Sequence, residues 1–299
     1  MTDVGAPPRQ ARVLRQSNLE FASDDPSEPG NGVRVGTYLG PDQGAVHLQV
    51  AVVELAGDAS VASHLHPFEE SFYVLEGSPS LRLAGNAFTL SPGDFGVVPI
   101  AAPHSWANRG EPARVLRVYA PQPRPMDNGT WGVYSAPEVG APTSESTIDE
   151  LDPRHGLVGH FDTSDMAPPA SILMPGYHGA NIRNVSIRMM VDELLGARHH
   201  TLFMVEFAPS GVPALSAKEH YHPFEEMYFF MSGRALGSFD GERVPIADGD
   251  LVFAGVGASH GFTADGEEPV RWIEAQSPLP PAANGFFFRS DWEKLDRDR

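Results

Sequence analysis

The chain has 299 residues, a formal net charge of −18 at pH 7 and no cysteine. Its length exceeds that of most single domains and favours two, while the lack of cysteine excludes disulfides and thiolate metal ligands. The acidic charge repels phosphate backbones, which argues against binding to nucleic acid.

Short apolar runs separated by turn residues predict an all-β protein. The first 30 residues are polar and contain proline, so we expect a flexible arm. They lack the apolar core of a secretory signal, which favours a cytoplasmic location. Beyond them, turn signals such as Glu76-Gly77 and Asp240-Gly241 recur between strand-like runs, as in barrels and sandwiches. No run of about 18 apolar residues predicts a membrane span.

A segment rich in proline, glycine and serine separates two strand-rich regions. Its later part, residues 184–195, reads as a strand or a short helix, and periodicity does not decide between them. After the second region, Ser290 is a candidate cap for a short terminal helix. The predicted divisions are a flexible N-terminal arm (1–30), a first barrel (31–121), a linker and packing segment (122–197), a second barrel (198–289) and a C-terminal helix or tail (290–299).

The two strand-rich regions repeat each other at a constant offset of 156 residues, and the repeat carries potential metal ligands. Alternate residues of a strand share a face, so the two histidines of each His-x-His stretch project together. Three neutral imidazoles and one carboxylate suit Mn, Fe, Ni, Co, Cu or Zn, and relative affinity alone does not choose among them. The predicted ligands are His64, His66, Glu70 and His104 in the first copy and His220, His222, Glu226 and His260 in the second.

This pattern resembles the two motifs of the cupin superfamily, His-x-His-x3-Glu-x6-Gly and Gly-x5-Pro-x-Gly-x2-His-x3-Asn. All eight ligand positions match, and the departures are Ala101, Gly255 and Ala264, which replace a Gly, a Pro and an Asn. The resemblance implies a bicupin: two tandem jelly-roll barrels, each with a pocket at its mouth for up to one divalent metal. Open coordination positions at such a metal suit catalysis.

Side chains beside the ligands are candidates for a substrate pocket. Phe72, Trp106, Tyr228 and Phe262 share the ligand face, as in a pocket for a planar or apolar substrate, although a barrel core gives the same pattern. Tyr228 also carries a hydroxyl that can donate a proton. Arg82 either points inward, where it would anchor a substrate carboxylate, or lies on the surface.

Two acidic residues and six histidines fall outside the ligand pattern. Glu69 and Glu225 have the opposite strand parity to the ligand glutamates, so we expect them to be solvated or bonded to backbone. The histidines expected to be structural or on the surface are His47, His155, His160, His178, His199 and His200.

The resemblance leaves three functions open, and in each of them the partner is a small molecule. The first is a metal-dependent dioxygenase similar to flavonol-cleaving bicupins, with Glu70 or Glu226 as proton acceptor, although those enzymes have a longer gap before the ligand glutamate. The second is a Mn-dependent decarboxylase, isomerase or aminohydrolase, and oxalate-decarboxylase-like bicupins share the three-residue gap seen here. The third is a non-catalytic binding protein. A homo-oligomer is compatible with all three.

Overall fold

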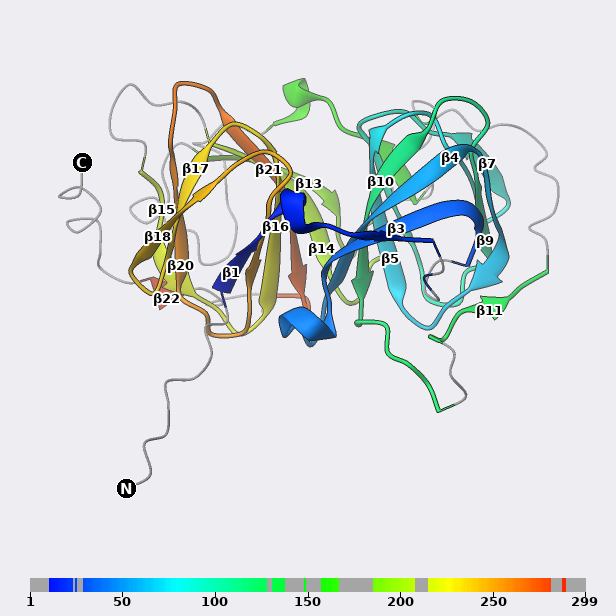
Figure 1. The fold of residues 1–299 in the computed structure, drawn as a ribbon, viewed down its shortest axis with the longest axis horizontal. Helices are drawn as coiled ribbons and strands as arrows, with labels where there is room; N and C mark the ends of the chain where they lie inside the picture. Colours follow the sequence, from blue (N-terminus) through cyan, green and yellow to red (C-terminus); the bar gives the residue numbers. More distant parts are fainter. Residues whose placement is uncertain are drawn as a thin grey trace.

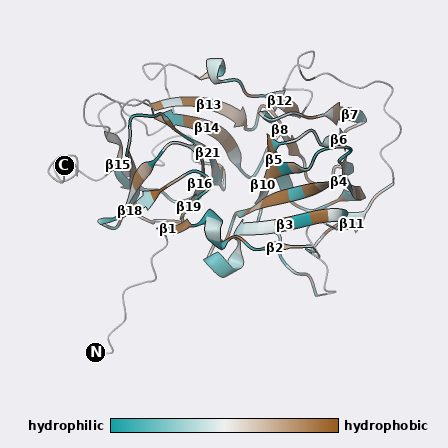
Figure 2. Ribbon diagram, turned by 45° about the horizontal axis from the view of Figure 1, so that its top comes forward, coloured by the Kyte–Doolittle hydropathy of each residue, from teal (hydrophilic) through white to brown (hydrophobic). Residues whose placement is uncertain are grey.

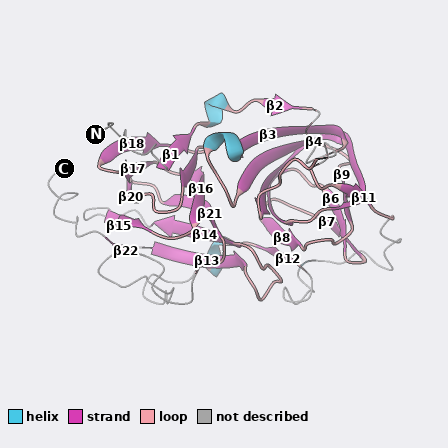
Figure 3. Cartoon of the chain, turned by 90° about the horizontal axis from the view of Figure 1, so that it is seen from below, coloured by secondary structure: helices cyan, strands magenta, loops and turns pink. Residues whose placement is uncertain are grey.

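Two β-barrels lie side by side in the computed structural model, and nearly all of their regular structure is strand (Figures 1 and 3). The structure describes residues 11–23, 25, 29–127, 131–137, 148, 157–166, 185–207, 215–280 and 287–288. The predicted terminal helix after Ser290 lies outside these residues. Described helical segments are short 3-10 turns: Gln16–Asn18, Pro41–Gln43 and Thr163–Asp165.

The first barrel is built around the long strand β4 (Gln49–Leu65), which takes part in both of its walls. The first half of β4 pairs with β3 and β10, and its second half pairs with β9, always antiparallel. The sheet order is β12-β8-β5-β10-β4-β9-β6-β7, with β3 and β11 also on β4 and β2 on β3. The other strands are β2 (Phe21–Ala22), β3 (Asn31–Leu39), β5 (Glu69–Glu76), β6 (Ser80–Leu83), β7 (Asn86–Thr89), β8 (Asp94–Val98), β9 (His104–Ala107), β10 (Ala113–Ala120) and β11 (Tyr134–Ser135).

The second barrel repeats this plan with two separate sheets. Their orders are β1-β19-β16-β21-β14-β13 and β18-β17-β20-β15-β22. The segment whose type the sequence left open forms strand β13, which extends the first of these sheets. The strands are β13 (Val185–Val191), β14 (Thr201–Phe207), β15 (Leu215–Tyr221), β16 (Glu225–Ser232), β17 (Ala235–Phe239), β18 (Glu242–Ile246), β19 (Leu251–Ala254), β20 (His260–Ala264), β21 (Val270–Ser277) and β22 (Phe287–Phe288). The predicted all-β architecture with two tandem barrels is confirmed.

Two short strands are exchanged between the halves of the chain. Strand β1 (Ala11–Leu14) precedes the first barrel but pairs with β19 of the second, whereas β12 (Val158–His160) precedes the second barrel but pairs with β8 of the first (Figure 2). The prediction of a flexible arm is therefore wrong for residues 11–14. Backbone hydrogen bonds to an exposed sheet edge hold that segment in place.

At the end of each exchanged strand, a side chain binds an aspartate of the other barrel, and the two aspartates occupy equivalent positions. Arg15 lies 2.6 Å from Asp250, and Nδ1 of His160 lies 2.7 Å from Asp94. His160 is thus structural, as predicted. These contacts fix the register of the exchanged strands.

The facing walls of the two barrels share a large apolar interface (Figure 2). Strands β10 and β21 bury both faces, one inside their own barrel and one against the neighbouring barrel. The Tyr38 hydroxyl crosses the interface and donates to the carbonyl of Gly249 at 2.6 Å. Interface side chains include Tyr38, Leu48, Val50, Val52, Leu116 and Val118 from the first barrel and Leu202, Met204, Met227, Phe229, Ile273 and Ala275 from the second.

Glu69 and Glu225 also make polar links across this interface. The Glu69 carboxylate accepts backbone N–H bonds from Arg198 (2.6 Å) and His199 (2.9 Å) and lies 3.1 Å from Nδ1 of His200. Burial alone would raise the pKa of Glu69, but the bonds from His200 and the two amides outweigh it and lower the pKa.

On the other side of the interface, Glu225 accepts three backbone N–H bonds. The donors are Val46 (2.7 Å), His47 (2.8 Å) and Leu48 (3.1 Å). Of the two predicted alternatives for Glu69 and Glu225, solvated or bonded to backbone, the structure shows bonding to backbone for both. Each of these glutamates directly precedes a ligand glutamate, so the strands β5 and β16 are anchored to the opposite barrel beside the sites they carry.

None of the helical segments in the described ranges has the length and apolar character that crossing a bilayer requires.

We expect Asp250→Ala to lower the free energy of unfolding by about 2 kcal/mol, because Asp250 is buried and accepts bonds from Arg15, Gln16 and Ala247. Urea unfolding followed by tryptophan fluorescence measures this change. Glu54→Ala, at an exposed ion pair with Arg34, is the control, with an expected loss of less than about 1 kcal/mol. Equal effects of the two variants would mean that the bonds from Arg15 and Gln16 to Asp250 contribute no stability.

Candidate metal centres

The predicted ligands come together at one end of each barrel because two neighbouring strands present them side by side. His64 in β4 is the cross-strand neighbour of His104 in β9, and His220 in β15 is the neighbour of His260 in β20. The second histidine of each copy follows its strand directly, and the turn after it leads into the strand that carries the glutamate. All eight side chains are buried.

Every one of the six imidazoles is held by a backbone carbonyl within two residues of it. A carbonyl oxygen only accepts hydrogen bonds, so Nδ1–H must be the donor in each case and Nε2 carries a lone pair. In both barrels these lone pairs are available for a metal, as expected where a second hydrogen bond orients a ligand. The pairs are His64 with Ala62, His66 with Phe68, His104 with Ala102, His220 with Lys218, His222 with Phe224 and His260 with Ala258, at 2.6–3.0 Å.

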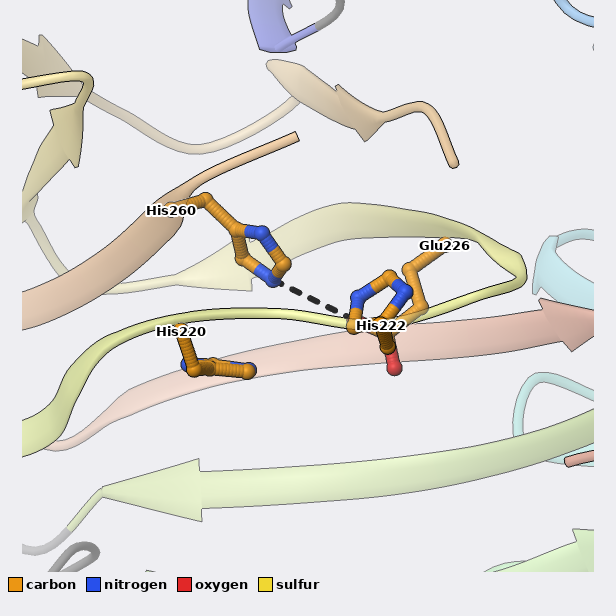
Figure 4. Close-up of side chains that lie close together, drawn as sticks. All are labelled: His220, His222, Glu226 and His260. Carbon is orange, nitrogen blue, oxygen red and sulfur yellow. Dashed lines mark ion pairs between the residues drawn. The ribbon is translucent and has the colours of Figure 1, made fainter. Parts of the chain in front are cut away.

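The second barrel brings all four ligands together. One ligand atom from each of His220, His222, Glu226 and His260 lies within 4.8 Å of the others. Figure 4 shows these side chains converging, with Oε2 of Glu226 at 2.7 Å from Nε2 of His222 and 3.3 Å from Nε2 of His260.

The first barrel forms a looser group. Its three imidazoles meet the same 4.8 Å limit, but the carboxylate does not join them. Oε2 of Glu70 lies 3.4 Å from Nε2 of His66 and 3.8 Å from Nε2 of His104.

The ionisation of both groups suits a metal cation. Burial lowers the pKa of His104 to about 3 and holds the pKa of His64 and His220 below the usual value, so these imidazoles are neutral at pH 7. For the two glutamates, burial alone would raise the pKa. Burial is the largest single influence, but in Glu70 the charge of Arg117 and the interactions with His66 and His104 together outweigh it, and in Glu226 the interactions with His222 and His260 do so. Both carboxyl groups are therefore ionised.

A phenylalanine supports the second histidine of each copy. Phe68 stacks on His66 with ring centroids 4.1 Å apart, and Phe224 stacks on His222 at 4.2 Å. Both pairs are almost parallel, at 8° and 7°. The Pro-Phe-Glu turn therefore fixes the ring plane of a ligand as well as carrying the chain back to the glutamate.

In the second barrel, polar side chains surround Glu226. The Tyr228 hydroxyl donates to Oε2 of Glu226 and lies 2.7 Å from Nε2 of His260. Nε2 of Gln276 donates to Oε1 of Glu226 at 2.7 Å and to Oε1 of Glu274 at 3.1 Å. One amide thus joins a candidate metal ligand to a second buried carboxyl group.

Glu274 borders a hollow inside the second barrel. Its Oε2 accepts a bond from Nε1 of Trp272 at 3.0 Å. Burial, reinforced by the charge of Glu226, raises the pKa of Glu274 well above its usual value. The hollow is lined by Glu274, Trp272, Tyr228 and His220 together with apolar side chains: Val185, Ile187, Val205, Phe207, Ala217 and Phe262.

The first barrel has different side chains at the corresponding places. Arg117 stands in β10 where Glu274 stands in β21, and it is fully buried. Its guanidinium lies 4.5 Å above the ring of Trp106, and its Nε is 3.4 Å from Oε1 of Glu70. Phe72, at the position of Tyr228, packs edge-on against Trp106 at 5.1 Å and offers no hydroxyl. The two centres therefore share their ligand types but not their surroundings.

A model of the cupin domain family matches the chain twice, at residues 51–119 and 203–275. Each match spans one complete group of histidines and glutamate. The protein is a bicupin.

Two curated proteins are similar to the bicupin in sequence. It is 28% identical over 124 residues to the tetracenomycin polyketide synthase protein TcmJ of Streptomyces glaucescens, covering 41% of this chain and 80% of that protein. It is 22% identical over 237 residues to the quercetin 2,3-dioxygenase of Bacillus subtilis, covering 72% and 69%. The second alignment extends over both barrels.

Solved structures share the fold of the bicupin at low identity. A protein described as glyoxylate-induced, from Pseudomonas aeruginosa, has a TM-score of 0.64 at 18% identity over 93% of this chain and 91% of that one. An oxalate decarboxylase from Lactobacillus farciminis has a TM-score of 0.62 at 15% identity over 96% and 90%. At such identities the likeness concerns the fold.

The residues of the bicupin fit a divalent metal. Within the described ranges, Nε2 of His66, Nε2 of His104 and both Glu70 carboxylate oxygens are buried without a hydrogen bond. Buried polar atoms rarely remain so unless something else satisfies them. Nitrogen and oxygen donors of this kind suit a transition metal, and they do not select one.

The structure buries four of the predicted pocket residues and leaves the fifth, Arg82, exposed. Phe72, Trp106, Tyr228 and Phe262 are all buried inside the barrels, and Tyr228 and Phe262 border the hollow. Of the two alternatives for Arg82, the structure shows the surface one, and Arg82 borders an open hollow of the first barrel rather than its interior. Its side chain is exposed because its neighbours Leu81 and Leu83 take the inward positions of β6.

Two buried charged residues of the bicupin, Arg117 and Glu274, were missed. The signal that could have found them is strand parity. Arg117 lies two residues from Val115 and from Tyr119, and therefore shares their inward face of the strand. The same parity places Glu274 beside the inward Trp272.

Proposed function

We propose that this bicupin is a metal-dependent dioxygenase that acts on a small organic molecule with a hydroxyl-bearing ring. The observation that carries the proposal is the complete four-ligand group of the second barrel, which lies beside an apolar hollow and bears the Tyr228 hydroxyl. A divalent transition metal held by His220, His222, Glu226 and His260 would supply Lewis acidity and redox chemistry.

The chain's own residues would manage protons and exclude water. Glu226, ionised and bonded to Tyr228 and Gln276, is placed to accept a proton from a substrate hydroxyl. Tyr228 is the adjacent donor that can return it. Apolar walls keep bulk water away, which strengthens hydrogen bonds and charges inside the site. A dioxygenase places both atoms of one O₂ in its product, so no further reductant is required.

Similar proteins support this choice of substrate class. The relative that aligns with both barrels is named a quercetin 2,3-dioxygenase. Two others are named as polyketide synthase proteins, TcmJ of Streptomyces glaucescens and CurC of Streptomyces cyaneus.

A Mn-dependent decarboxylase is the second candidate, and Arg117 is the observation that favours it. A buried guanidinium beside the first centre could bind a substrate carboxylate. It ranks second because Arg117 already faces Glu70 and stacks on Trp106, with no exposed surface.

Oxygen uptake distinguishes the two reactions. The metal-free chain, loaded separately with Fe, Mn, Co, Ni, Cu or Zn, is mixed with quercetin or oxalate in an oxygen-electrode cell. We expect one O₂ to be consumed per quercetin converted with at least one redox-active metal, and none with Zn. Carbon dioxide released from oxalate without oxygen would favour the decarboxylase. No conversion of either compound with any metal would contradict the dioxygenase and leave a binding protein.

A further inference from the structure

We infer that the second barrel, and not the first, receives the substrate, and that Glu274 is its polar anchor, binding a hydroxyl group of the ligand's ring. The ring class rests on the function proposed above. The choice of barrel and the role of Glu274 rest on the geometry of the two interiors.

The hollow in the second barrel favours an apolar ring edge. The space inside it that a water-sized sphere can occupy measures about 20 Å³, enough for about one water molecule, and all the space between its lining atoms, open solvent included, is about 330 Å³. Two neighbouring strands, β13 and β14, supply one aliphatic and aromatic wall through Val185, Ile187, Val205 and Phe207. A wall of these apolar side chains recognises flat, apolar surface and offers no hydrogen bonds.

Glu274 supplies the carboxyl group of this mainly apolar lining, which also includes His220 and Tyr228. Its two oxygens accept one bond each, from Trp272 and Gln276, which fixes the orientation of the group. In either protonation state a carboxyl group can make more than two hydrogen bonds, as acceptor only when ionised and as donor and acceptor when protonated, so Glu274 retains capacity for a ligand hydroxyl. An apolar ligand of the same shape would cover Glu274 without offering it a hydrogen-bond partner, and this is unfavourable.

Gln276 connects Glu274 to the candidate metal centre through hydrogen bonds. The same Nε2 group bonds to Glu274 and to Glu226. His220, another predicted ligand, borders the same hollow. A ring whose hydroxyl is bound by Glu274 would therefore lie next to the metal ligands rather than in a separate site.

The first barrel is not built to receive the same ligand. Trp106 and Arg117 stand where the second barrel has Phe262 and Glu274, and they pack on each other at 4.5 Å. Both side chains are larger than their counterparts and fully buried. Arg117 also faces Glu70, so its charge serves the first centre itself.

Calorimetric titration of the Zn-loaded full chain tests the inference, since zinc is redox-inert and prevents turnover. The probes are quercetin and flavone, which share a ring skeleton, but flavone has no hydroxyl groups. We expect Glu274→Leu to weaken quercetin binding roughly tenfold to a hundredfold and flavone binding less than about threefold. Glu274→Gln, which keeps the shape and an acceptor oxygen, should retain most of the affinity.

Arg82→Met, at an exposed position that borders the open hollow of the first barrel, is the control variant and should leave quercetin binding unchanged. Circular dichroism and metal content verify that each variant is folded and loaded. The inference is overturned if quercetin does not bind the parent chain, if Glu274→Leu leaves its affinity intact, or if Arg82→Met weakens it equally. Binding that follows the expected pattern without oxygen uptake under any metal would contradict only the dioxygenase reaction.

Discussion

His222→Ala is expected to remove the metal of the second barrel and to reduce turnover by at least about a thousandfold, since enzymes typically supply a millionfold or more. His222 contributes one of three imidazole ligands, its Nε2 lies 2.7 Å from Glu226, and its ring is stacked on Phe224. The alanine substitution removes both the imidazole ligand and its stacking contact with Phe224. Even changes to groups that only orient a ligand lower metal affinity by about 10–100-fold, so loss of a ligand must cost more.

Mass spectrometry of bound metal and a turnover assay read out this prediction. The parent chain should hold about one metal per barrel, and His222→Ala and His66→Ala should each lose one of the two. His47→Ala is the control, because the His47 side chain is not a predicted ligand and its backbone bond to Glu225 survives. Less than about 0.2 metal per parent chain after loading with divalent ions would refute the metal-centre assignment.

Glu69→Ala should lower the free energy of unfolding by about 3–5 kcal/mol, because it leaves buried donors without an acceptor. The carboxylate binds the backbone of Arg198 and His199 and faces His200, all from the opposite barrel. No water replaces it, since Glu69 is almost completely buried. The unfolding midpoint should fall by roughly 10 °C for a chain of this size.

Differential scanning calorimetry with zinc in excess separates this effect from loss of metal. Glu225→Ala, which removes the corresponding acceptor on the other side, should produce a loss of similar size. Glu76→Ala, at an exposed ion pair with Arg114, serves as the neutral control. If Glu69→Ala behaves like Glu76→Ala, the interface does not depend on these glutamates.

The repeat and the ligand positions could be predicted from the sequence because their chemistry is local. A His-x-His stretch places two imidazoles on one face of a strand whatever the rest of the fold does. The third ligand, His104 or His260, is then required to complete the set. The backbone roles of Glu69 and Glu225 followed from parity in the same way.

Strand exchange could not be predicted, because β1 is only four residues long and its partner lies at the far end of the sequence. Short apolar runs carry too little signal to name a distant edge. Arg117 was hidden for another reason. Strand β10 is buried on both faces, so alternating polarity did not mark which face looks into the barrel. The arginine predicted as a candidate carboxylate anchor was Arg82 instead.

The exchanged strands also bear on how such a chain can be divided. A fragment holding only the second repeat would lack β1, leaving the edge of β19 open, and a fragment holding only the first would lack β12 and expose β8. Open edges recruit strands from other molecules. Two copies of a single repeat could each cover the open sheet edge of the other by exchanging their leading strands, which is the arrangement of a strand-swapped dimer. The bicupin is in this sense a covalently fused swapped dimer, and its halves are better suited to reassembly from two fragments than to independent folding.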